Sequence, residues 1–371
     1  MSDHTKAVLR PAAETVYADQ LAALATDDSG PRPDGWQRTP RAVRRFIIGD
    51  KALGIDAKFV NDDALVDRCI VSLMGRQGLM LVGEPGTAKS LLSELLAAAI
   101  SGRSTAVIQG SAGIIEDHLR YGWNYALLLA EGPSPGAMVP SPVLSAMQAG
   151  HIVRVEELTR CAPEVQDVLI SLMSEKTITV PELGSEYELR AKPGFNVIGT
   201  ANLRDRGVHD MSSALKRRFN FETVHPIADA GYEKALVARQ LKERMAEHPQ
   251  ATLPDSDVLD LLVTVFRDLR LGRLEDGTMV ASPKAVMSTA EIVNLAHAAT
   301  LDATYLDGGT VAGGHIARQL PGVVFKDVVE DARKLRSYID LVARDRANKS
   351  TVWRDFFHAA QQALARIEIG D

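Results

Sequence analysis

The chain has 371 residues, of which 46% are hydrophobic and 24% are charged, so it can bury a core and a globally disordered protein is excluded. Its 42 Lys and Arg residues against 48 Asp and Glu residues give a net charge of −6, which disfavours a dedicated, basic nucleic-acid-binding protein. Because the sequence has neither an apolar run of about 18 residues nor a segment of signal-peptide type near its start, we expect a cytoplasmic protein without a membrane span.

Residues 1–55 are predicted to form an N-terminal extension that is partly linker-like. The stretch Thr26–Pro40 is rich in Asp, Gly and Pro, a composition that favours neither a long helix nor a long strand. A short basic cluster of Arg41, Arg44 and Arg45 follows it. This cluster is either a solvated face of the linker or a contact arm for a partner.

A helix, a strand, a glycine-rich turn and a second helix follow in close succession. Residues 60–77 carry apolar side chains at helical spacing, with Asn61 or Asp62 as the N-cap. The short apolar run Leu79–Val82 predicts a buried strand. Residues 91–101, which follow the glycine-rich turn, contain neither Gly nor Pro and predict a helix. The segment is therefore predicted to be a βα unit.

Further short apolar runs indicate more strands of the same sheet. The helical pattern of Pro163–Glu175 lies between two of them. Strands that are separated by helices predict a mostly parallel sheet with helices on both faces. The additional strands are expected at Thr105–Gln109, His151–Val155, Phe195–Thr200 and Phe219–Val224.

Two stretches between the expected strands are predicted to be an exposed loop and a hairpin. The stretch Glu131–Pro142 contains four prolines and is expected to be an exposed loop. A long loop in a compact domain usually has a function. Residues 179–190 are expected to form a hairpin around Gly184–Ser185.

Strand signals stop after Pro226, and helical patterns take over. Ser282 and Pro283 have the character of a helix start, with a serine cap and a proline at the first helical position. We therefore expect an α/β domain at residues 56–226 and a helical domain at residues 227–371. Its helices are expected at Tyr232–Glu247, Asp255–Leu271, Pro283–Leu301 and within 323–369.

The glycine-rich turn carries the strongest chemical signal. Glycines let several backbone N–H groups converge on one anion, and the following helix adds its positive end. Lys89 would bring a cation to the β- and γ-phosphates of ATP, and the Ser90 hydroxyl would bind Mg²⁺. Ala88 stands where the strict consensus has glycine. The predicted nucleotide-binding residues are Gly83, Glu84, Pro85, Gly86, Thr87, Ala88, Lys89, Ser90 and Leu91.

Polar residues at the ends of two later strands complete a hydrolytic site. Glu156 can support Mg²⁺ through water, and Glu157 can polarise an attacking water molecule. Most phosphate-loop ATPases have Asp at the first of these positions, and Arg154 interrupts the usual apolar run. Asn202 follows the next expected strand and could orient the same water, because ligands of open α/β sheets bind at the carboxyl edge.

Three consecutive cations, Lys216, Arg217 and Arg218, precede the last expected strand. An arginine stabilises the charge that develops on a γ-phosphate, and a neighbouring subunit can supply it. A solvated helix end, where cations suit the helix dipole, is the alternative interpretation.

Taken in order, these motifs resemble the AAA+ ATPases of the MoxR group over roughly residues 60–300. The resemblance implies an α/β P-loop domain, with a parallel sheet flanked by helices, followed by a smaller all-helical lid domain. The segments that carry it are GEPGTAKS at the phosphate loop, VEELTRCAPEVQDVLISLMSEKTITV at the acidic pair, GTANLRDRGVHDMSSALKRRFNF at the end of the domain, and ASPKAV in the helical part.

The resemblance also implies a role for each candidate residue. Many members have Arg where this chain has Lys284, so the charge is kept here but the bidentate fork is lost. The roles are phosphate and Mg²⁺ binding for Lys89 and Ser90, metal support for Glu156, catalytic base for Glu157, sensor 1 for Asn202, arginine finger for Arg218 with Arg217 as the alternative, and sensor 2 for Lys284.

The resemblance further implies partners. Residues 131–142 fall at the helix-2 insertion of the group, and residues 179–190 fall at its pre-sensor-1 hairpin. In the family both insertions face the central axis of a ring, usually a hexamer, and touch substrate. The group also implies a partner protein with a von Willebrand A-type metal-binding domain.

We therefore predict a MoxR-like ATPase that hydrolyses Mg-ATP at subunit interfaces of a homo-oligomeric ring and, like a chaperone, remodels or matures a protein partner. Two alternatives stay open. The first is a nucleotide-binding scaffold that hydrolyses ATP slowly or not at all, which Glu156 and Lys284 would favour. The second is a nucleic-acid-associated motor, against which the net charge and the acidic residues Glu116, Asp117 and Glu131 weigh.

Overall fold

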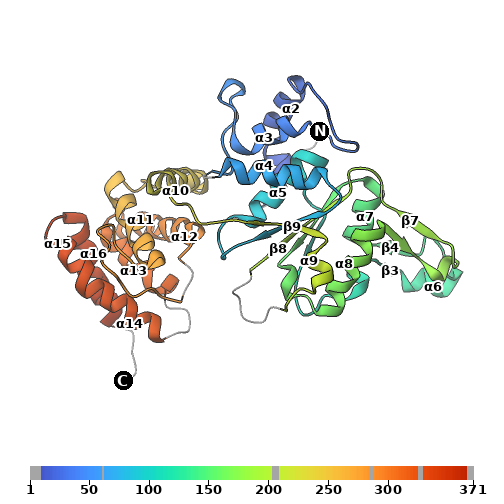
Figure 1. The fold of residues 1–371 in the computed structure, drawn as a ribbon. Coiled ribbons are helices and arrows are strands. Elements are labelled where there is room, and N and C mark those ends of the chain that lie inside the picture. The colour runs from blue at the N-terminus through green and yellow to red at the C-terminus, as the bar shows by residue number, and fades with distance from the viewer. Residues whose placement is uncertain (1–9, 61, 203–208, 285–286, 325–328, 366–371) are drawn as a thin grey trace. The chain divides into compact units, whose positions relative to one another are not determined.

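The computed structural model describes residues 10–60, 62–202, 209–284, 287–324 and 329–365. The chain divides into two compact units (Figure 1). The α/β unit comprises Met1–Glu84 and Ala88–Val224, and the helical unit comprises Pro85–Thr87 and His225–Asp371. Residues 366–369 of the expected C-terminal helical stretch lie outside the described residues. Every helix in the described ranges is too short or too polar to span a bilayer.

A five-stranded sheet forms the centre of the α/β unit. All neighbouring strands are parallel, and Gly78 on the first strand pairs with Phe219 on the last. The carboxyl ends of the strands therefore meet at one edge, and the parallel sheet expected from the apolar runs is confirmed. In spatial order the strands are β2 (Val107–Gln109), β5 (Ile152–Glu156), β8 (Asn196–Ala201), β1 (Gly78–Val82) and β9 (Phe219–Thr223).

Helices cover both faces of this sheet, as the alternation of side chains along β1 requires. Leu79 and Leu81 belong to the core that includes α4 and α5, whereas Met80 and Val82 belong to the core that includes α7 and α8. These helices and the short α9 are α4 (Asp63–Met74), α5 (Lys89–Ser101), α7 (Pro142–Ala149), α8 (Pro163–Glu175) and α9 (Ser213–Lys216).

The described part of residues 1–55 packs into the α/β unit, whereas its sequence suggests a partly linker-like extension. Leu24 and Phe46 are fully buried in the same core as α4 and α5. Arg38 donates hydrogen bonds to the carbonyls of Leu21 and Ala99, which fixes the Gly- and Pro-rich loop. The free energy gained by burying these apolar residues keeps the segment packed, although its composition is typical of a loop. The helices of this part are α1 (Ala13–Val16), α2 (Ala18–Thr26) and α3 (Pro40–Ile48).

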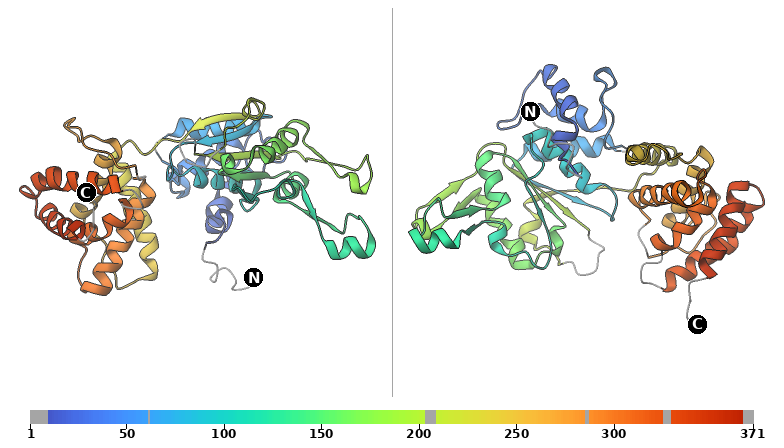
Figure 2. Two further views of the ribbon diagram at one scale, coloured as in Figure 1. Left: turned by 90° about the horizontal axis from the view of Figure 1, so that it is seen from below. Right: turned by 180° about the vertical axis from the view of Figure 1, so that it is seen from behind.

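Two arms extend from the α/β unit (Figure 2). The first arm consists of β3 (Tyr121–Trp123), α6 (Tyr125–Glu131) and β4 (Met138–Pro140), and β4 pairs antiparallel with β3. The expectation that Glu131–Pro142 forms only an exposed loop is therefore wrong at its second half. The second arm pairs β6 (Thr177–Thr179) with β7 (Glu188–Arg190), which confirms the expected hairpin.

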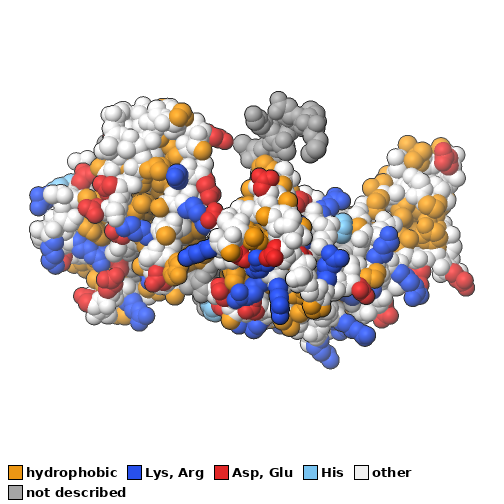
Figure 3. Space-filling view, turned by 90° about the horizontal axis from the view of Figure 1, so that it is seen from above, with side chains coloured by type: hydrophobic (Ala, Val, Ile, Leu, Met, Phe, Trp, Pro, Cys, Tyr) orange, Lys and Arg blue, Asp and Glu red, His pale blue; other side chains and the backbone are white. Residues whose placement is uncertain are grey.

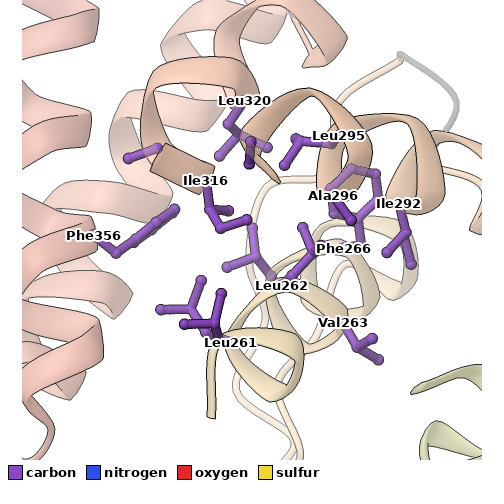
Figure 4. Packing of buried hydrophobic residues seen from close by; sticks show 14 of the residues in the cluster. Leu261, Leu262, Val263, Phe266, Ile292, Leu295, Ala296, Ile316, Leu320 and Phe356 are labelled. Carbon is purple, nitrogen blue, oxygen red and sulfur yellow. The ribbon is translucent and has the colours of Figure 1, made fainter. Parts of the chain in front are cut away.

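The helical unit has its own hydrophobic core. Figure 4 shows Phe266 and Leu262 of one helix meeting Ile316 and Leu320 of another, with Phe356 beside them. Its helices are α10 (Ala230–Arg244), α11 (Ser256–Leu271), α12 (Thr289–Asp302), α13 (Gly313–Val324), α14 (Val329–Tyr338), α15 (Arg344–Ala347) and α16 (Thr351–Ala365).

One expected helix start in this unit is wrong. The helix expected from Pro283 begins at Thr289 instead. Ser288 accepts a hydrogen bond from the Glu291 N–H while Glu291 accepts one from Ser288, a capping box that satisfies two free donors. The hydroxyl of Ser282 donates to the carbonyl of Leu269, 2.5 Å away, and therefore does not cap a helix.

Candidate active site

The glycine-rich segment forms a tight loop between β1 and α5. Gly86 and Ala88 both adopt left-handed backbone conformations, with φ of 75° and 67°. The second is unusual because the methyl group of alanine makes this conformation cost about 1–2 kcal/mol. Helix α5 begins directly afterwards at Lys89, so its positive end and its free N–H groups lie at the loop.

Lys89 and Ser90 lie on the first turn of α5. The Lys89 Nζ donates hydrogen bonds to the carbonyls of Gly83 and Glu84, at 3.0 and 2.7 Å, so the ammonium group lies against the loop. The Ser90 hydroxyl donates to Glu156 Oε2 at 2.7 Å. This contact joins the predicted phosphate loop to the predicted acidic pair.

Glu156 is extensively hydrogen-bonded. It ends β5, and only 4% of it is exposed. Its Oε1 accepts hydrogen bonds from Arg154 at 2.8 Å and from Ser93 at 2.6 Å. Its Oε2 accepts from Ser90 and from Thr200, both at 2.7 Å. Each carboxylate oxygen therefore has two donors.

These donors keep Glu156 ionised. Burial by itself would raise the pKa of this carboxyl group, because a charge loses its hydration. The hydrogen bonds from Ser93 and Ser90, the positive charge of Arg154 and the hydrogen bond from Thr200 oppose burial and hold the pKa below its ordinary value. A carboxylate rather than a carboxylic acid is thus present next to Ser90 near neutral pH.

Glu157 differs from its neighbour in exposure and backbone conformation. Its φ is 52°, a left-handed conformation that non-glycine residues adopt mainly at turns or strained functional positions. Its N–H donates to the Thr200 hydroxyl at 2.9 Å, and its carboxylate pairs with Arg160 at 2.6 Å. About half of the side chain is exposed, so this carboxylate can reach water.

Asn202 follows the carboxyl end of β8 and is 8% exposed. Since β8 lies between β5 and β1 in the sheet, Asn202 emerges at the same edge as Glu157 and the phosphate loop. The structure therefore places residues 83–84, 88–91, 156, 157 and 202 at the carboxyl edge of the sheet.

Arg217 and Arg218 lie at the opposite edge. They precede β9, and the carbonyl of Arg218 accepts a hydrogen bond from Gly78 at the start of β1. Five residues of β1 separate this edge from the phosphate loop, a distance on the order of 15 Å. Arg217 is exposed, whereas Arg218 donates to the Ser174 hydroxyl and to the carbonyl of Ala214. Neither arginine is placed to act on the loop of its own chain.

Lys284 belongs to the helical unit. Its Nζ pairs with Glu330 at 3.1 Å, and its N–H donates to Asp331 at 2.7 Å. Its side chain is more than half exposed. The expected sensor 2 cation is therefore paired with an acidic residue of its own unit.

The oxygen and nitrogen atoms of the residues at this edge are suited to bind a nucleotide together with Mg²⁺. Among the described residues, no group of three or more His, Cys, Asp or Glu side chains could enclose a metal ion. Mg²⁺ bound to nucleotide needs no such cage, because phosphates and water supply most of its ligands. Ser90 and Glu156 would hold the metal, and Lys89 with the loop amides would hold the phosphates.

The sequence interpretation missed three residues of this site. Ser93 and Thr200 hold the Glu156 carboxylate, and Arg154 pairs with it. Their spacing carries a signal: Arg154 and Glu156 are two apart on a strand, and Ser90 and Ser93 are three apart on a helix, so each pair shares one face. That the two faces meet is known only from the fold.

Two family models match the chain. The AAA domain of the dynein-related subfamily matches residues 78–219, from β1 to the start of β9. The YehL-like AAA+ ATPase C-terminal domain matches residues 231–364 in the helical unit. The phosphate loop and the acidic pair therefore lie within an AAA domain.

Relatives match over different lengths. The YehL protein of Escherichia coli K12 is 47% identical over 362 residues, which cover 97% of this chain and 99% of that protein. The protein SH1500 of Staphylococcus haemolyticus is 26% identical and covers 58% of this chain and 77% of its own length. Among solved structures, NtrX from Brucella abortus in complex with ATP is 11% identical with a TM-score of 0.49, covering 84% of this chain and 70% of that one. This last likeness is too distant to bear on function.

Proposed function

Because the chain belongs to the YehL-like AAA+ ATPases, we propose that it binds and hydrolyses Mg-ATP at the subunit boundaries of a cytoplasmic ring and uses the energy to remodel a protein partner. A hexamer, a MoxR-like mode of action and a partner with a von Willebrand A-type domain are the specific forms of this proposal. The observation that carries it is the convergence of Lys89, Ser90 and Glu156 at the carboxyl edge of the sheet.

Each residue of this edge has a defined task. Lys89 and the amides of the loop hold the phosphates, and Ser90 with Glu156 holds the metal. Bound Mg²⁺ supplies positive charge that stabilises the phosphates during transfer. Glu157, half-exposed and paired with Arg160, accepts a proton from water that Asn202 helps to orient.

The position of Arg218 supports a site between subunits. A cation at the amino edge of the sheet is too far from its own loop to touch a γ-phosphate, so it can act only on the loop of another copy. To do so, Arg218 must exchange its hydrogen bonds with Ser174 and Ala214 for phosphate oxygens.

The first arm supports a protein partner. Helix α6 exposes Leu129 by 88% and Tyr125 by 72%, and Figure 3 shows hydrophobic side chains gathered at this end of the α/β unit. Exposed apolar clusters of this kind mark protein interaction sites. The Tyr121 hydroxyl donates to Glu182 at 2.9 Å, which ties the first arm to the second.

A slowly hydrolysing scaffold is the second candidate. The four donors on Glu156 and the ion pair of Lys284 with Glu330 both favour it, because each engages a residue that catalysis would use. Changing Glu156 to Asp separates the two: a large gain in turnover favours the scaffold, and a loss favours the ATPase.

The proposal is tested by binding of a fluorescent ATP analogue and by phosphate release with Mg²⁺ present. Lys89→Ala should weaken binding roughly 10–100-fold, since a charge-assisted hydrogen bond contributes about 1.5–3 kcal/mol. Lys242→Ala, at an exposed position of α10, is the matched control and should bind normally. Unchanged binding and turnover in Lys89→Ala would refute the proposed site.

A further inference from the structure

A buried arginine lies directly behind the candidate magnesium site. Arg154 is 7% exposed, although it pairs with the apolar residues Val107 and Ile198 on the two neighbouring strands. Arginine is almost never buried without partners, because its charge loses hydration. Arg154 has no role in the nucleotide binding and hydrolysis proposed above.

The guanidinium of Arg154 connects three parts of the α/β unit. Its Nε donates to the Ser93 hydroxyl at 2.9 Å, and its Nη1 donates to the carbonyl of Ser104 at 3.1 Å. Its Nη2 donates to the carbonyl of Ser90 at 3.1 Å and to Glu156 Oε1 at 2.8 Å. The planar fork of arginine can make these four contacts at once, which the single ammonium group of lysine cannot.

These contacts orient the Glu156 carboxylate. Arg154 and Ser93 hold Oε1, so Oε2 faces Ser90 and Thr200. Because Ser90 gives its proton to Oε2, its oxygen lone pairs are free to face away from the carboxylate. The direction of these lone pairs therefore depends on where the carboxylate is held.

A glutamate at this position needs such support more than an aspartate does. Its extra methylene group places the carboxylate about 1.5 Å farther from the backbone and adds a rotatable bond. Without a contact on Oε1, the carboxylate of Glu156 could turn away from Ser90.

We propose that Arg154 is a positioning residue for metal-bound nucleotide: it holds the Glu156 carboxylate so that Ser90 presents its oxygen to Mg²⁺, and the two residues form an interdependent pair. This inference rests on the proposed nucleotide site. It predicts that an apolar residue suits position 154 only when a shorter carboxylate stands at position 156.

A purely structural role predicts that changes at Arg154 and Glu156 alter stability but leave the dependence of nucleotide binding on Mg²⁺ unchanged. Replacing both members of a buried ion pair by residues that need no partner is often neutral for stability. Stability alone therefore does not distinguish the two roles. The dependence of nucleotide binding on Mg²⁺ does, because it reports on the orientation of Ser90.

The test measures how much Mg²⁺ tightens the binding of a fluorescent ADP analogue, as the ratio of Kd in EDTA to Kd in Mg²⁺. We expect Arg154→Val and Glu156→Asp each to lower this ratio about tenfold, as loss of a residue that supports a metal ligand does. The double variant Arg154→Val/Glu156→Asp should recover most of the ratio. Arg154→Lys should recover only part of it.

Two outcomes would overturn the inference alone: Arg154→Val with the wild-type ratio, or a double variant whose loss equals the sum of the single losses in free energy. Circular dichroism checks that each variant is folded. If Arg154→Val does not fold, Arg154→Lys and Glu156→Asp still test the inference. If Mg²⁺ does not change the Kd of the wild-type protein for the nucleotide, the proposed function itself is overturned.

Discussion

Glu156 in the α/β unit and Glu233 in the helical unit are both buried carboxylates with several donors, but the donors differ in charge. Both oxygens of Glu233 accept hydrogen bonds from the guanidinium of Arg270, and Arg267 lies 3.4 Å away. Only Oε1 of Glu156 faces a guanidinium, that of Arg154. Its other oxygen faces hydroxyl groups alone.

This difference separates a structural carboxylate from one that can support a metal ligand. The guanidinium of Arg270 holds both oxygens of Glu233 in a bidentate ion pair, which adds geometric specificity, so this pair joins α10 to α11 firmly. A hydroxyl can give its proton to a carboxylate and still offer a lone pair to a metal ion. Burial and a full set of donors do not by themselves identify a functional site.

The largest effect is expected in the α/β unit, where a change at a functional residue should lower turnover without lowering stability. Arg218→Ala should lower ATP hydrolysis about 10³-fold, as loss of an arginine finger does, while nucleotide still binds. Arg217→Ala tests the alternative finger and should have a smaller effect, and Lys216→Ala, at an exposed position, is the matched control. Phosphate release is the measurement.

A mixing experiment checks the same prediction independently. Arg218→Ala keeps Lys89, and Lys89→Ala keeps Arg218. A mixture of these two inactive variants should therefore regain part of the activity if the arginine acts on a neighbouring chain. A mixture that stays inactive would contradict a site shared between subunits.

In the helical unit we expect the reverse, a loss of stability without a direct effect on chemistry. Glu233→Ala should destabilise this unit by about 3–5 kcal/mol, because it removes the fully buried carboxylate that pairs with the partly buried guanidinium groups of Arg267 and Arg270. The exposed Glu247 serves as the control, since its change to Ala should cost little. Chemical unfolding followed by circular dichroism measures both. A stable Glu233→Ala protein that cannot bind nucleotide would break the contrast.

A smaller effect is expected at the phosphate loop. Ala88→Gly removes the strain of a left-handed alanine but adds freedom to the unfolded chain, so it should stabilise the protein by only about 0.5–1 kcal/mol. Lys176, with a φ of 56° outside the site, is the control position for the same change to glycine. Thermal unfolding measures both variants. If Ala88→Gly is less stable than the wild-type protein, Ala88 is not strained.

The smallest effect on stability is expected at the first arm. Leu129 is 88% exposed, so Leu129→Ser should change the free energy of unfolding by less than about 0.5 kcal/mol. The fully buried Leu262 is the contrast, because Leu262→Ala should cost about 2–5 kcal/mol. A large loss in Leu129→Ser would show that α6 packs as structure and is not free for a partner.

Much of the fold could be predicted from the sequence because the strands are short, apolar and separated by helices. The runs at Leu79–Val82 and Phe195–Thr200 match β1 and β8 to within one residue at each end. The helix expected at Pro163–Glu175 has those bounds in the structure, because a proline begins it and Lys176 ends it in a left-handed conformation.

Other features depend on contacts that no local pattern contains. Arg154 looks like an interruption of a strand until α5 brings Ser93 beside it. The proline-rich half of the first arm looks like a loop until Met138–Pro140 pair with β3. Likewise, the burial of Trp36 shows only when the segment around it is packed against the rest of the α/β unit.

We propose that a second copy of the chain completes the active site. This proposal is tested most directly by the rate of ATP hydrolysis per subunit, measured with Mg²⁺ over a wide range of protein concentration. We predict a specific rate that rises with concentration to a plateau, because the phosphate loop of one chain needs Arg218 of another. A measurable specific rate that stays constant down to concentrations at which the protein is monomeric would contradict the account.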